Sequence, residues 1–593
     1  MKDLTERPFA ALPFTLPSLR EIYRDGARPR AIIDEFLARL AEIDDPGIFI
    51  HLASEEDLRR AADDLGAFDP ARALWGVPFA VKDNIDVAGM PTTAACEAYR
   101  YMPDRDAFVV ARLRAAGAIP VGKTNLDQFA TGLVGVRSPF APPRNALDPA
   151  IVPGGSSSGS GVIIGHGALP FALGTDTAGS GRVPAALNNI VGLKPSLGAL
   201  STSGVVPACR TLDTVSIFAA SVEDAHAAFR VAAGFDAADG YARPVRTGPL
   251  PAPLPQPRIA IPDAASLRFF GDEAQAAYFA SACDALSARN AQITEIDFTP
   301  FYEVAQMLYD GAWVAERFAV IEPLFRKDPE AIHPVTRAIV AKADSMSATD
   351  AFRGLYRLAD LKRACAPLIA AHEMLCVPTI PRFYTVDDLS ADPVTPNSNL
   401  GTYTNFVNLL DLCALAVPVG RRSDGRPGSI TLIGPSGADG LLAAEAIRLQ
   451  AGPDAMGIAK PAPAPDEIAL AVCGAHMSGL PLNGELVSRG GRFLQATETS
   501  ADYRLYALPG GPPERPGLIR SGNGASIALE IWALPRPSVG DLLAGIPSPL
   551  GLGQIQLDNG TNVAGFLCEA IAAQGAKDIT AFGGWRRYLS GGS

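Results

Sequence analysis

Residues 154–182 read GGSSSGSGVIIGHGALPFALGTDTAGSGR, and this stretch decides the fold of the 593-residue chain. It contains two turns rich in glycine and serine, at 154–161 and 174–182. The apolar run 171–174 leads directly into the second turn and indicates a buried strand. A glycine-rich turn after a strand can aim successive backbone amides at one point, so the second turn is a candidate oxyanion hole.

The segments on either side of this stretch predict an α/β fold. Short apolar runs alternate with helical patterns and glycine-rich turns, and we expect strands at 76–81, 119–121, 171–174 and 191–193. Apolar residues recur at helical spacing over about 19–65, 272–288 and 302–325. This alternation predicts a central sheet covered by helices. The proline-rich stretch 243–258 is either a linker or a surface excursion within one domain.

A second domain is expected after the run Lys-Pro-Ala-Pro-Ala-Pro at 460–465. Such a run forms a stiff, extended spacer. Beyond it the pattern changes to short strands and turns, with strands expected at 467–472, 503–508 and 526–534. We therefore expect a large domain over 1–455, a linker over 456–466 and a β-rich α+β domain over 467–593.

The charge balance limits the partners of the chain. The net charge is -12, which argues against nucleic acid and anionic membranes as partners. The first 20 residues lack an apolar core of the secretory type, and no apolar run is long enough to span a bilayer. We expect a cytoplasmic protein with reduced cysteines, because the eight cysteines stand singly without a CxxC pair. No metal or organic cofactor is indicated.

Residues 117–124 read GAIPVGKT and match the phosphate-binding loop of nucleotide hydrolases. That loop must follow a strand and open a helix. Here a helical segment precedes it, the expected strand lies inside it, and Pro120 removes an amide donor. The nucleotide reading is therefore a minor alternative.

Residues 155–159 fit the Gly-x-Ser-x-Gly pattern of a nucleophile elbow, with Ser157 as the nucleophile. The elbow needs a preceding strand and a histidine base. The preceding residues carry two prolines and show no clear strand, and the chain has only six histidines. Each histidine of the first domain is better explained as a surface or core residue.

Lys82 is a candidate general base. It ends the apolar segment Val-Pro-Phe-Ala-Val-Lys, in a chain with only nine lysines against 42 arginines. Burial lowers the pKa of a lysine, and a neutral amine can accept a proton. A lysine that merely reaches solvent from a strand end is the plainer alternative for an arbitrary lysine.

The combination of Lys82 with the two glycine and serine turns resembles the amidase signature family, over about residues 20–450. The resemblance implies a Ser-Ser-Lys triad without histidine. Ser180 would be the nucleophile, Ser156 the bridging serine in a cis peptide, and Lys82 the base. The amides of Thr177, Ala178, Gly179 and Ser180 would form the oxyanion hole. Two residues depart from the commoner pattern: Ser158 and Ala178 stand where glycine is usual, and Ala178 keeps its amide in place only if its φ stays negative.

Residues 308–317 and the sequence after Ser180 are similar to the allophanate hydrolase branch of this family. The resemblance implies that Tyr309 and Arg317 bind the carboxylate of the substrate, and Gly132 is a weaker candidate contact through its backbone. A guanidinium suits this task because it binds a carboxylate with two hydrogen bonds. A core helix with a solvated arginine is the alternative. The expected substrate is a small anionic amide, allophanate.

Residues 472–483 and 528–535 are similar to the C-terminal domain of that branch, which resembles the γ-glutamyl cyclotransferase fold. The resemblance implies that the first domain releases ammonia and that the second promotes loss of carbon dioxide from N-carboxycarbamate. His476 would be its general base, although a lone histidine in a turn is more often structural. Glu530 is either a second pocket residue or a paired strand carboxylate.

Several readings of the function remain open at this stage. We expect a homodimer, and the resemblance implies a biotin-dependent urea carboxylase as a pathway neighbour. The alternatives are hydrolysis of another small amide, transamidation as in the amidase that acts on misacylated tRNA, nucleotide hydrolysis, and a binding protein without catalysis.

Overall fold

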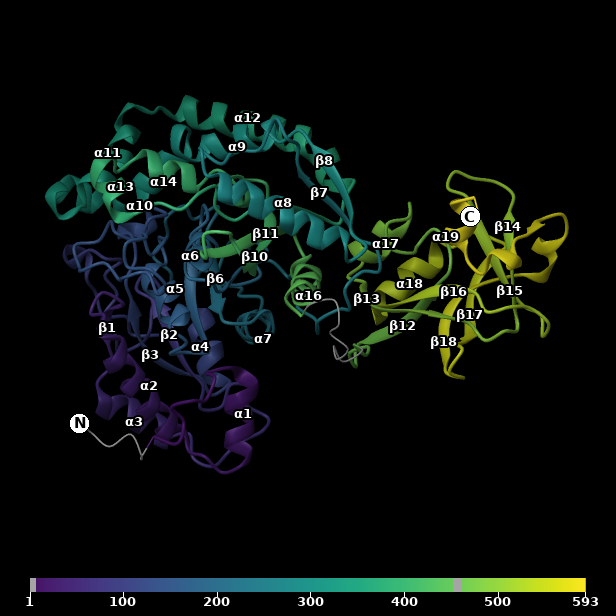
Figure 1. Ribbon diagram of the computed structural model, residues 1–593, viewed down its shortest axis with the longest axis horizontal. Helices are drawn as coiled ribbons and strands as arrows, with labels where there is room; N and C mark the ends of the chain where they lie inside the picture. The colour runs from purple at the N-terminus through teal and green to yellow at the C-terminus, as the bar shows by residue number, and fades with distance from the viewer. Residues whose placement is uncertain (1–6, 452–460, 592–593) are drawn as a thin grey trace. The chain divides into compact units, whose positions relative to one another are not determined.

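A computed structural model describes residues 7–451 and 461–591 of the chain. Contacts divide the chain into two compact units (Figure 1). The first comprises Met1–Thr247, Ala260–Leu286 and Ile293–Gln450, and the second comprises Gly248–Ile259, Ser287–Gln292 and Ala451–Ser593. Part of the proline-rich stretch 243–258 thus belongs to the second unit. Residues 456–460 of the expected linker lie outside the described residues, and the domain boundaries stay predictions.

The first unit is built on a large mixed sheet. Eleven strands of the described residues follow the order β1-β3-β2-β4-β6-β5-β10-β11-β9-β7-β8. β2 runs parallel to β3 and to β4, whereas β4 and β6 are antiparallel. The strands are β1 (Phe49–Leu52), β2 (Pro78–Lys82), β3 (Ile119–Thr124), β4 (Phe171–Asp176), β5 (Val191–Lys194), β6 (Thr214–Ala219), β7 (Arg258–Pro262), β8 (Gln292–Ile296), β9 (Met374–Pro378), β10 (Leu412–Arg421) and β11 (Pro427–Pro435).

Helices cover this sheet, which confirms the predicted α/β class with a mixed sheet covered by helices. Their bounds are α1 (Leu16–Arg24), α2 (Pro29–Ile43), α3 (Glu55–Asp63), α4 (Phe108–Ala115), α5 (Ser158–Gly165), α6 (Val183–Leu187), α7 (Val222–Ala232), α8 (Glu273–Ser287), α9 (Thr299–Asp310), α10 (Trp313–Lys327), α11 (Pro334–Val340), α12 (Ala348–Ala370), α13 (Val386–Ala391), α14 (Thr395–Leu400), α15 (Phe406–Leu409) and α16 (Asp439–Gln450).

The N-terminal region was expected to be helical over about 19–65, and the strand β1 corrects this. β1 pairs antiparallel with β3 through Phe49 opposite Thr124 and Leu52 opposite Gly122. The strands approach so closely that a Cβ on Gly122 would lie 2.6 Å from the backbone oxygen of His51. A partner strand distant in sequence fixes this segment, and local periodicity does not reveal it.

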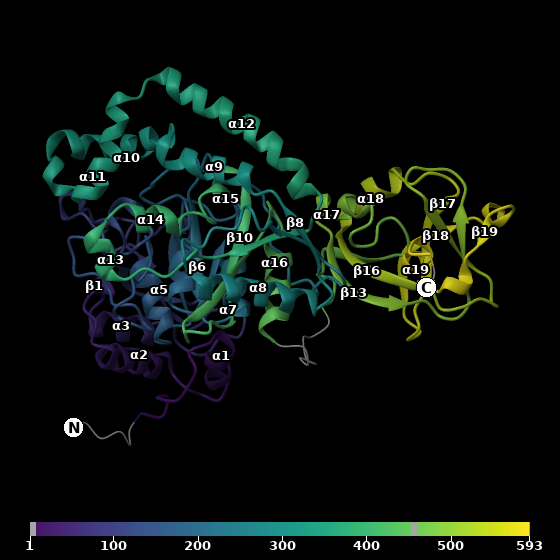
Figure 2. The same ribbon diagram turned by 45° about the horizontal axis from the view of Figure 1, so that its top comes forward.

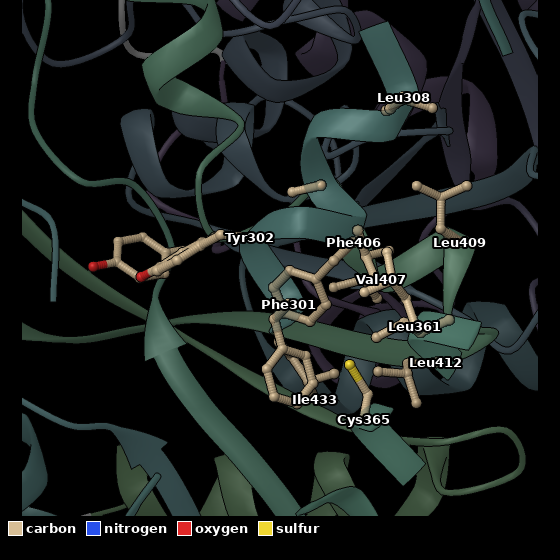
Figure 3. Packing of buried hydrophobic residues seen from close by; sticks show 14 of the residues in the cluster. Phe301, Tyr302, Leu308, Leu361, Cys365, Phe406, Val407, Leu409, Leu412 and Ile433 are labelled. Atoms are coloured by element: carbon tan, nitrogen blue, oxygen red, sulfur yellow. The ribbon is translucent and has the colours of Figure 1, made fainter. Parts of the chain in front are cut away.

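The helix expected over 302–325 is two helices, α9 and α10, which Gly311 separates. Figures 1 and 2 show α9, α10, α11 and α12 gathered on the same side of the first unit. Aromatic side chains pack beneath them, and the rings of Phe301 and Phe406 lie 5.3 Å apart (Figure 3). The same core cluster includes Trp313 of α10 and Ala178 of the second glycine turn. The helical layer is therefore packed directly against the candidate oxyanion hole.

The second unit is rich in β-structure, as predicted. One sheet of the described residues has the order β13-β16-β12-β18-β17 and another has the order β15-β14-β19. The elements are β12 (Glu467–Val472), α17 (Asn483–Ser488), β13 (Arg492–Glu498), β14 (Tyr503–Leu508), β15 (Arg515–Arg520), β16 (Ala528–Pro535), α18 (Arg536–Ala544), β17 (Leu550–Gln556), β18 (Asn562–Cys568), β19 (Lys577–Asp578) and α19 (Trp585–Leu589). Apolar residues of both sheets share one core, around Leu505, Leu529 and Trp585.

Candidate active site

Lys82 ends β2, between β3 and β4, and is completely buried. Its Nζ lies 2.7 Å from Ser156 Oγ and 2.7 Å from Thr175 Oγ1. Burial lowers the pKa of Lys82 to about 7, against the opposing attraction of the carboxylates of Asp127, Asp213 and Asp176. A substantial fraction of this amine is therefore neutral near pH 7, as a general base requires.

The first glycine turn places Ser156 on Lys82. The Gly155–Ser156 peptide bond is cis. Asp127 fills the space beside it, because a Cβ on Gly155 would lie 2.0 Å from Asp127 Oδ2. The carboxylate of Asp127 also accepts the amides of Gly135 and Arg137, at 3.0 and 2.8 Å. Asp127 thus holds two loops together behind Ser156.

Ser157 has a different environment from Ser156. Its Oγ donates to the backbone oxygen of Thr175 at 3.2 Å and accepts the Thr175 amide at 3.3 Å. The residue precedes α5, and no strand of the described residues leads into it. A hydroxyl tied to the backbone of β4 lacks the histidine and the exposed turn of a nucleophile elbow.

The second glycine turn is shaped by a buried ion pair. Arg182 binds Asp176 with two hydrogen bonds of 2.9 and 3.0 Å, and Asp176 also accepts the Gly181 amide. Gly179 allows a close approach, since a Cβ there would lie 2.3 Å from Thr404 Oγ1. The chain between Asp176 and Arg182 is therefore closed into a tight turn that carries Ser180.

The amides of this turn are free. Within the described residues, the amides of Thr177, Ala178, Gly179 and Ser180 donate no hydrogen bond to the backbone or to a side chain. Ala178 does not adopt a positive φ, so the departure from glycine leaves its amide in place. Ser180 is 2% exposed. No hydrogen bond joins the hydroxyls of these two described serines, so the structure brings Lys82 and Ser156 together but not Ser156 and Ser180.

Asp213 supports the same turn from the other side. Thr177 Oγ1 donates to Asp213 Oδ1, and the amides of Ala208 and Cys209 donate to the same carboxylate. Burial raises the pKa of Asp213 to about 6. Asp213 also lines a cavity of about 280 Å³.

Arg317 and Tyr309 meet beside the loop that contains Gly132. Arg317 is 3% exposed, and its Nη1 lies 3.4 Å from Thr131 Oγ1. The guanidinium lies 5.2 Å from the centre of the Tyr309 ring. Nε and Nη2 of Arg317 are buried without a hydrogen-bond partner among the described residues. A buried guanidinium with unused donors is costly unless a ligand binds it, so this corner is suited to an anion.

Gly132 lies next to Thr131 in a tightly packed segment. A Cβ on Gly132 would lie 2.5 Å from Asp127 Oδ2. This position therefore admits only glycine, whatever part its backbone plays in binding substrate.

Lys123 of the phosphate-loop match is an internal structural residue. The helix α4 precedes the match, and β3 runs through it, which confirms the expected order of elements. Lys123 Nζ lies 3.3 Å from Asp83 Oδ1 and donates to Pro91 and Thr92. Both members of the ion pair are buried, so no phosphate could displace it without large rearrangement.

His476 lines a cavity of about 310 Å³ in the second unit. Its ring stacks on Phe566, with ring centres 4.9 Å apart, and Nε2 lies 3.4 Å from Glu485 Oε2. Burial lowers the pKa of His476 more than Glu485 raises it, which favours the neutral imidazole that a base requires.

Glu530 does not line this cavity. It is buried, and its carboxylate accepts hydrogen bonds from the Ser478 amide and hydroxyl and from Trp532 Nε1. Arg586 pairs with it at 2.8 Å. Of the two alternatives for Glu530, the paired strand carboxylate describes the structure.

Two further properties concern membranes and metals. Among the residues with described positions, no helix combines the length and the apolar character that a membrane span needs. In the same residues, no three His, Cys, Asp or Glu side chains are grouped so as to hold a metal ion.

Comparison with known proteins bears on this geometry. A family model described as Amidase matches residues 31–443. The chain belongs to the amidase family. It is therefore an amidohydrolase, and the centre around Lys82 lies within the matched region. A second model, described as Allophanate hydrolase C-terminal domain, matches residues 468–590 of this amidase.

Individual relatives agree with the family assignment. The amidase is 44% identical over 543 residues to the urea amidolyase of Saccharomyces cerevisiae, covering 87% of this chain and 30% of that protein. It thus spans about a third of the length of such relatives. The solved structure of selenomethionine-substituted Kluyveromyces lactis allophanate hydrolase matches with a TM-score of 0.77 and 40% identity, over 97% of this chain and 99% of the other. A glutamyl-tRNA(Gln) amidotransferase protein of Treponema pallidum is 32% identical, over 70% of this chain and 90% of its own.

Sequence reasoning missed four polar residues of the amidase centre: Thr175, Asp127, Asp213 and Arg137. Arg137 is buried and donates to the backbone oxygens of Thr131 and Pro393. None of the four belongs to a spaced motif with Lys82 or Ser180. The available signal was burial, since an aspartate directly after an apolar strand needs a partner inside the fold.

Proposed function

We propose that the protein hydrolyses allophanate, with Lys82, Ser156 and Ser180 as its catalytic triad. The observation that carries the proposal is the buried guanidinium of Arg317, whose Nε and Nη2 have no partner among the described residues. Allophanate is a urea that bears a carboxylate, and Arg317 together with Tyr309 offers that carboxylate a charged and aromatic corner. The name of the matched Kluyveromyces lactis structure supports the same substrate.

The first step is acyl transfer to Ser180. Neutral Lys82 accepts the proton of Ser156 as the Ser180 hydroxyl turns toward Ser156 and passes its own proton on. The Ser180 oxygen attacks the terminal amide carbonyl, and the amides of Thr177 to Ser180 stabilise the oxyanion. The C–N bond breaks, the relayed proton goes to the departing amine, and ammonia leaves. Water then cleaves the ester by the same relay and releases N-carboxycarbamate.

The second step belongs to the cavity of the second unit. N-carboxycarbamate with one protonated carboxyl group binds there, and neutral His476 accepts that proton. The C–N bond to this carboxyl group breaks, carbon dioxide leaves, and His476 returns the proton to the nitrogen. The product is carbamate. The position of His476 in a cavity and its lowered pKa support this role.

Hydrolysis of another small amide by the same triad is the second candidate. The similarity of the first domain to an amidotransferase protein favours it. Two features speak against transamidation on tRNA. The net charge of -12 opposes polyanion binding, and residues 468–590 match a C-terminal domain model that is described as part of allophanate hydrolase.

The proposal extends to the setting of the enzyme. It includes a homodimer in the cytoplasm and a division into domains at 1–455, 456–466 and 467–593. The urea amidolyase relatives indicate a link to urea carboxylation, and we propose a biotin-dependent urea carboxylase as the source of allophanate.

Ammonia release from allophanate, malonamate and a neutral aryl amide tests the substrate assignment. Arg317→Gln should lower kcat/KM for the two anionic substrates by about 10- to 100-fold, the usual cost of losing a charged hydrogen bond. The neutral amide should be unaffected. Arg326→Gln is a matched control on the same helix, since Arg326 is exposed and paired with Glu322 and Asp344. An equal loss for all three substrates would show that Arg317 does not recognise the carboxylate.

A further inference from the structure

The cavity of the second unit contains a second basic side chain besides His476. Arg515, the first residue of β15, lines the same cavity. Gly474 and Pro516 show how closely β15 approaches the His476 loop, because a Cβ on Gly474 would lie 2.6 Å from Pro516 Cδ. Arg515 therefore stands directly beside the segment that carries His476.

The guanidinium of Arg515 is available to a ligand. It is half-buried, and among the residues with described positions it forms no ion pair and no side-chain hydrogen bond. Other arginines of the unit are paired: Arg492 with Glu467, Arg520 with Asp502, and Arg586 with Glu530. The carboxylate in the cavity lining, Glu485, pairs with His476. Within the described chain, the cavity thus keeps a cation without a counter-charge.

Backbone donors in the same lining are also unused. The amides of Gly474, Ala475 and His476 donate no hydrogen bond within the described parts of the chain. The loop is held rigid from behind, since the Ser478 amide and hydroxyl donate to buried Glu530 at 2.7 Å each. Successive free amides beside a guanidinium are a typical binding site for a carboxylate or phosphate group.

We propose that Arg515 is the anion-recognition residue of this cavity and that the site takes small dicarboxylates. One carboxylate binds Arg515 and the free amides, and the second carboxyl group faces His476. The inference rests on the proposed second step, whose substrate carries two carboxyl groups on a single nitrogen. In this arrangement the carboxyl group that stays on the product is held by charge, and the departing one meets the base.

Binding of malonate to the full-length chain tests this assignment. Malonate carries two carboxylates on one carbon and does not turn over. The His476 ring is observed by NMR of ¹³C-labelled histidine, with His476→Asn identifying its signal. Malonate should shift this signal in a saturable manner, malonamate should bind more weakly, and malonamide should not bind.

The decisive comparison is between two substitutions on one strand. Arg515→Gln should weaken malonate binding at the His476 signal by about tenfold or more, and Arg515→Lys should weaken it less. Arg520→Gln, at the exposed far end of β15, should leave it unchanged. Equal affinity in Arg515→Gln and wild type, with both folded by circular dichroism, would overturn the proposal, as would a His476 signal that malonate does not move. Because the readout needs no turnover, its failure is separate from a failure of Ser180-dependent ammonia release.

Discussion

The two candidate reaction centres hold their basic groups in different ways. Lys82 is fully buried and bound by two hydroxyl groups, between turns whose glycines leave no space for a Cβ. His476 lines an open cavity, and its ring has a stacking partner and a partly exposed carboxylate at 3.4 Å. Packing fixes the first centre, whereas a loop and one buried carboxylate fix the second. Changes at the first should therefore cost more activity than changes at the second.

The largest expected effect comes from two buried lysines on neighbouring strands. Lys82 has hydroxyl partners, and Lys123 has the buried carboxylate of Asp83. Lys82→Met should lower kcat/KM for ammonia release by up to about 10⁴-fold with little loss of stability. Lys123→Met should instead lower the free energy of unfolding by about 3–5 kcal/mol, because it leaves Asp83 unpaired. Urea titration and initial rates check both.

The contrast between these lysines fails if both variants lose the same activity per folded molecule. Lys123 would then take part in the chemistry, or Lys82 would be no more than a structural residue.

A smaller effect is expected from pH. The folded-state pKa of Lys82 is lowered to about 7 from 10.5, so its neutral form gains population as pH rises through about 7. With malonamate as substrate, kcat/KM should fall about tenfold for each pH unit below that value. Protonation of Asp213, with a pKa of about 6, should add a second decrease that Asp213→Asn removes. A rate that rises only near pH 10 would contradict a lowered lysine pKa.

The smallest effect is expected at the second centre. His476→Ala should leave the first ammonia release unchanged and slow the appearance of carbon dioxide, since the cavity acts after Ser180. Stopped-flow detection of carbon dioxide alongside ammonia measures the lag. His372→Ala, in the first unit, is the matched histidine control. An unchanged lag would mean that N-carboxycarbamate decarboxylates unaided.

The sequence predicted the parts of the fold that rest on local pattern. The strands at 467–472 and 503–508 have the expected bounds, because alternation and turn residues define them. β1 escaped prediction, since its pairing with β3 is a tertiary effect. The division of 302–325 into α9 and α10 depends on a single glycine in an otherwise helical pattern.

The candidate site shows the same limit. Lys82, Ser156 and Ser180 could be selected from motif spacing, and the structure places Lys82 on Ser156. The supporting carboxylates of Asp127 and Asp213 could not, because their partners are backbone amides contributed by folded loops. Arg515 could not be selected either, since only the folded chain shows that, among the described residues, it lacks a counter-charge beside His476.

Ammonia release from allophanate by Ser180→Ala tests the central claim most directly. Ser180 carries the proposed nucleophile, and alanine fits a position that is 2% exposed without crowding the turn. The account predicts that the variant folds with wild-type stability and loses ammonia release by at least about 10⁴-fold. Turnover within tenfold of wild type would contradict the Lys82–Ser156–Ser180 triad.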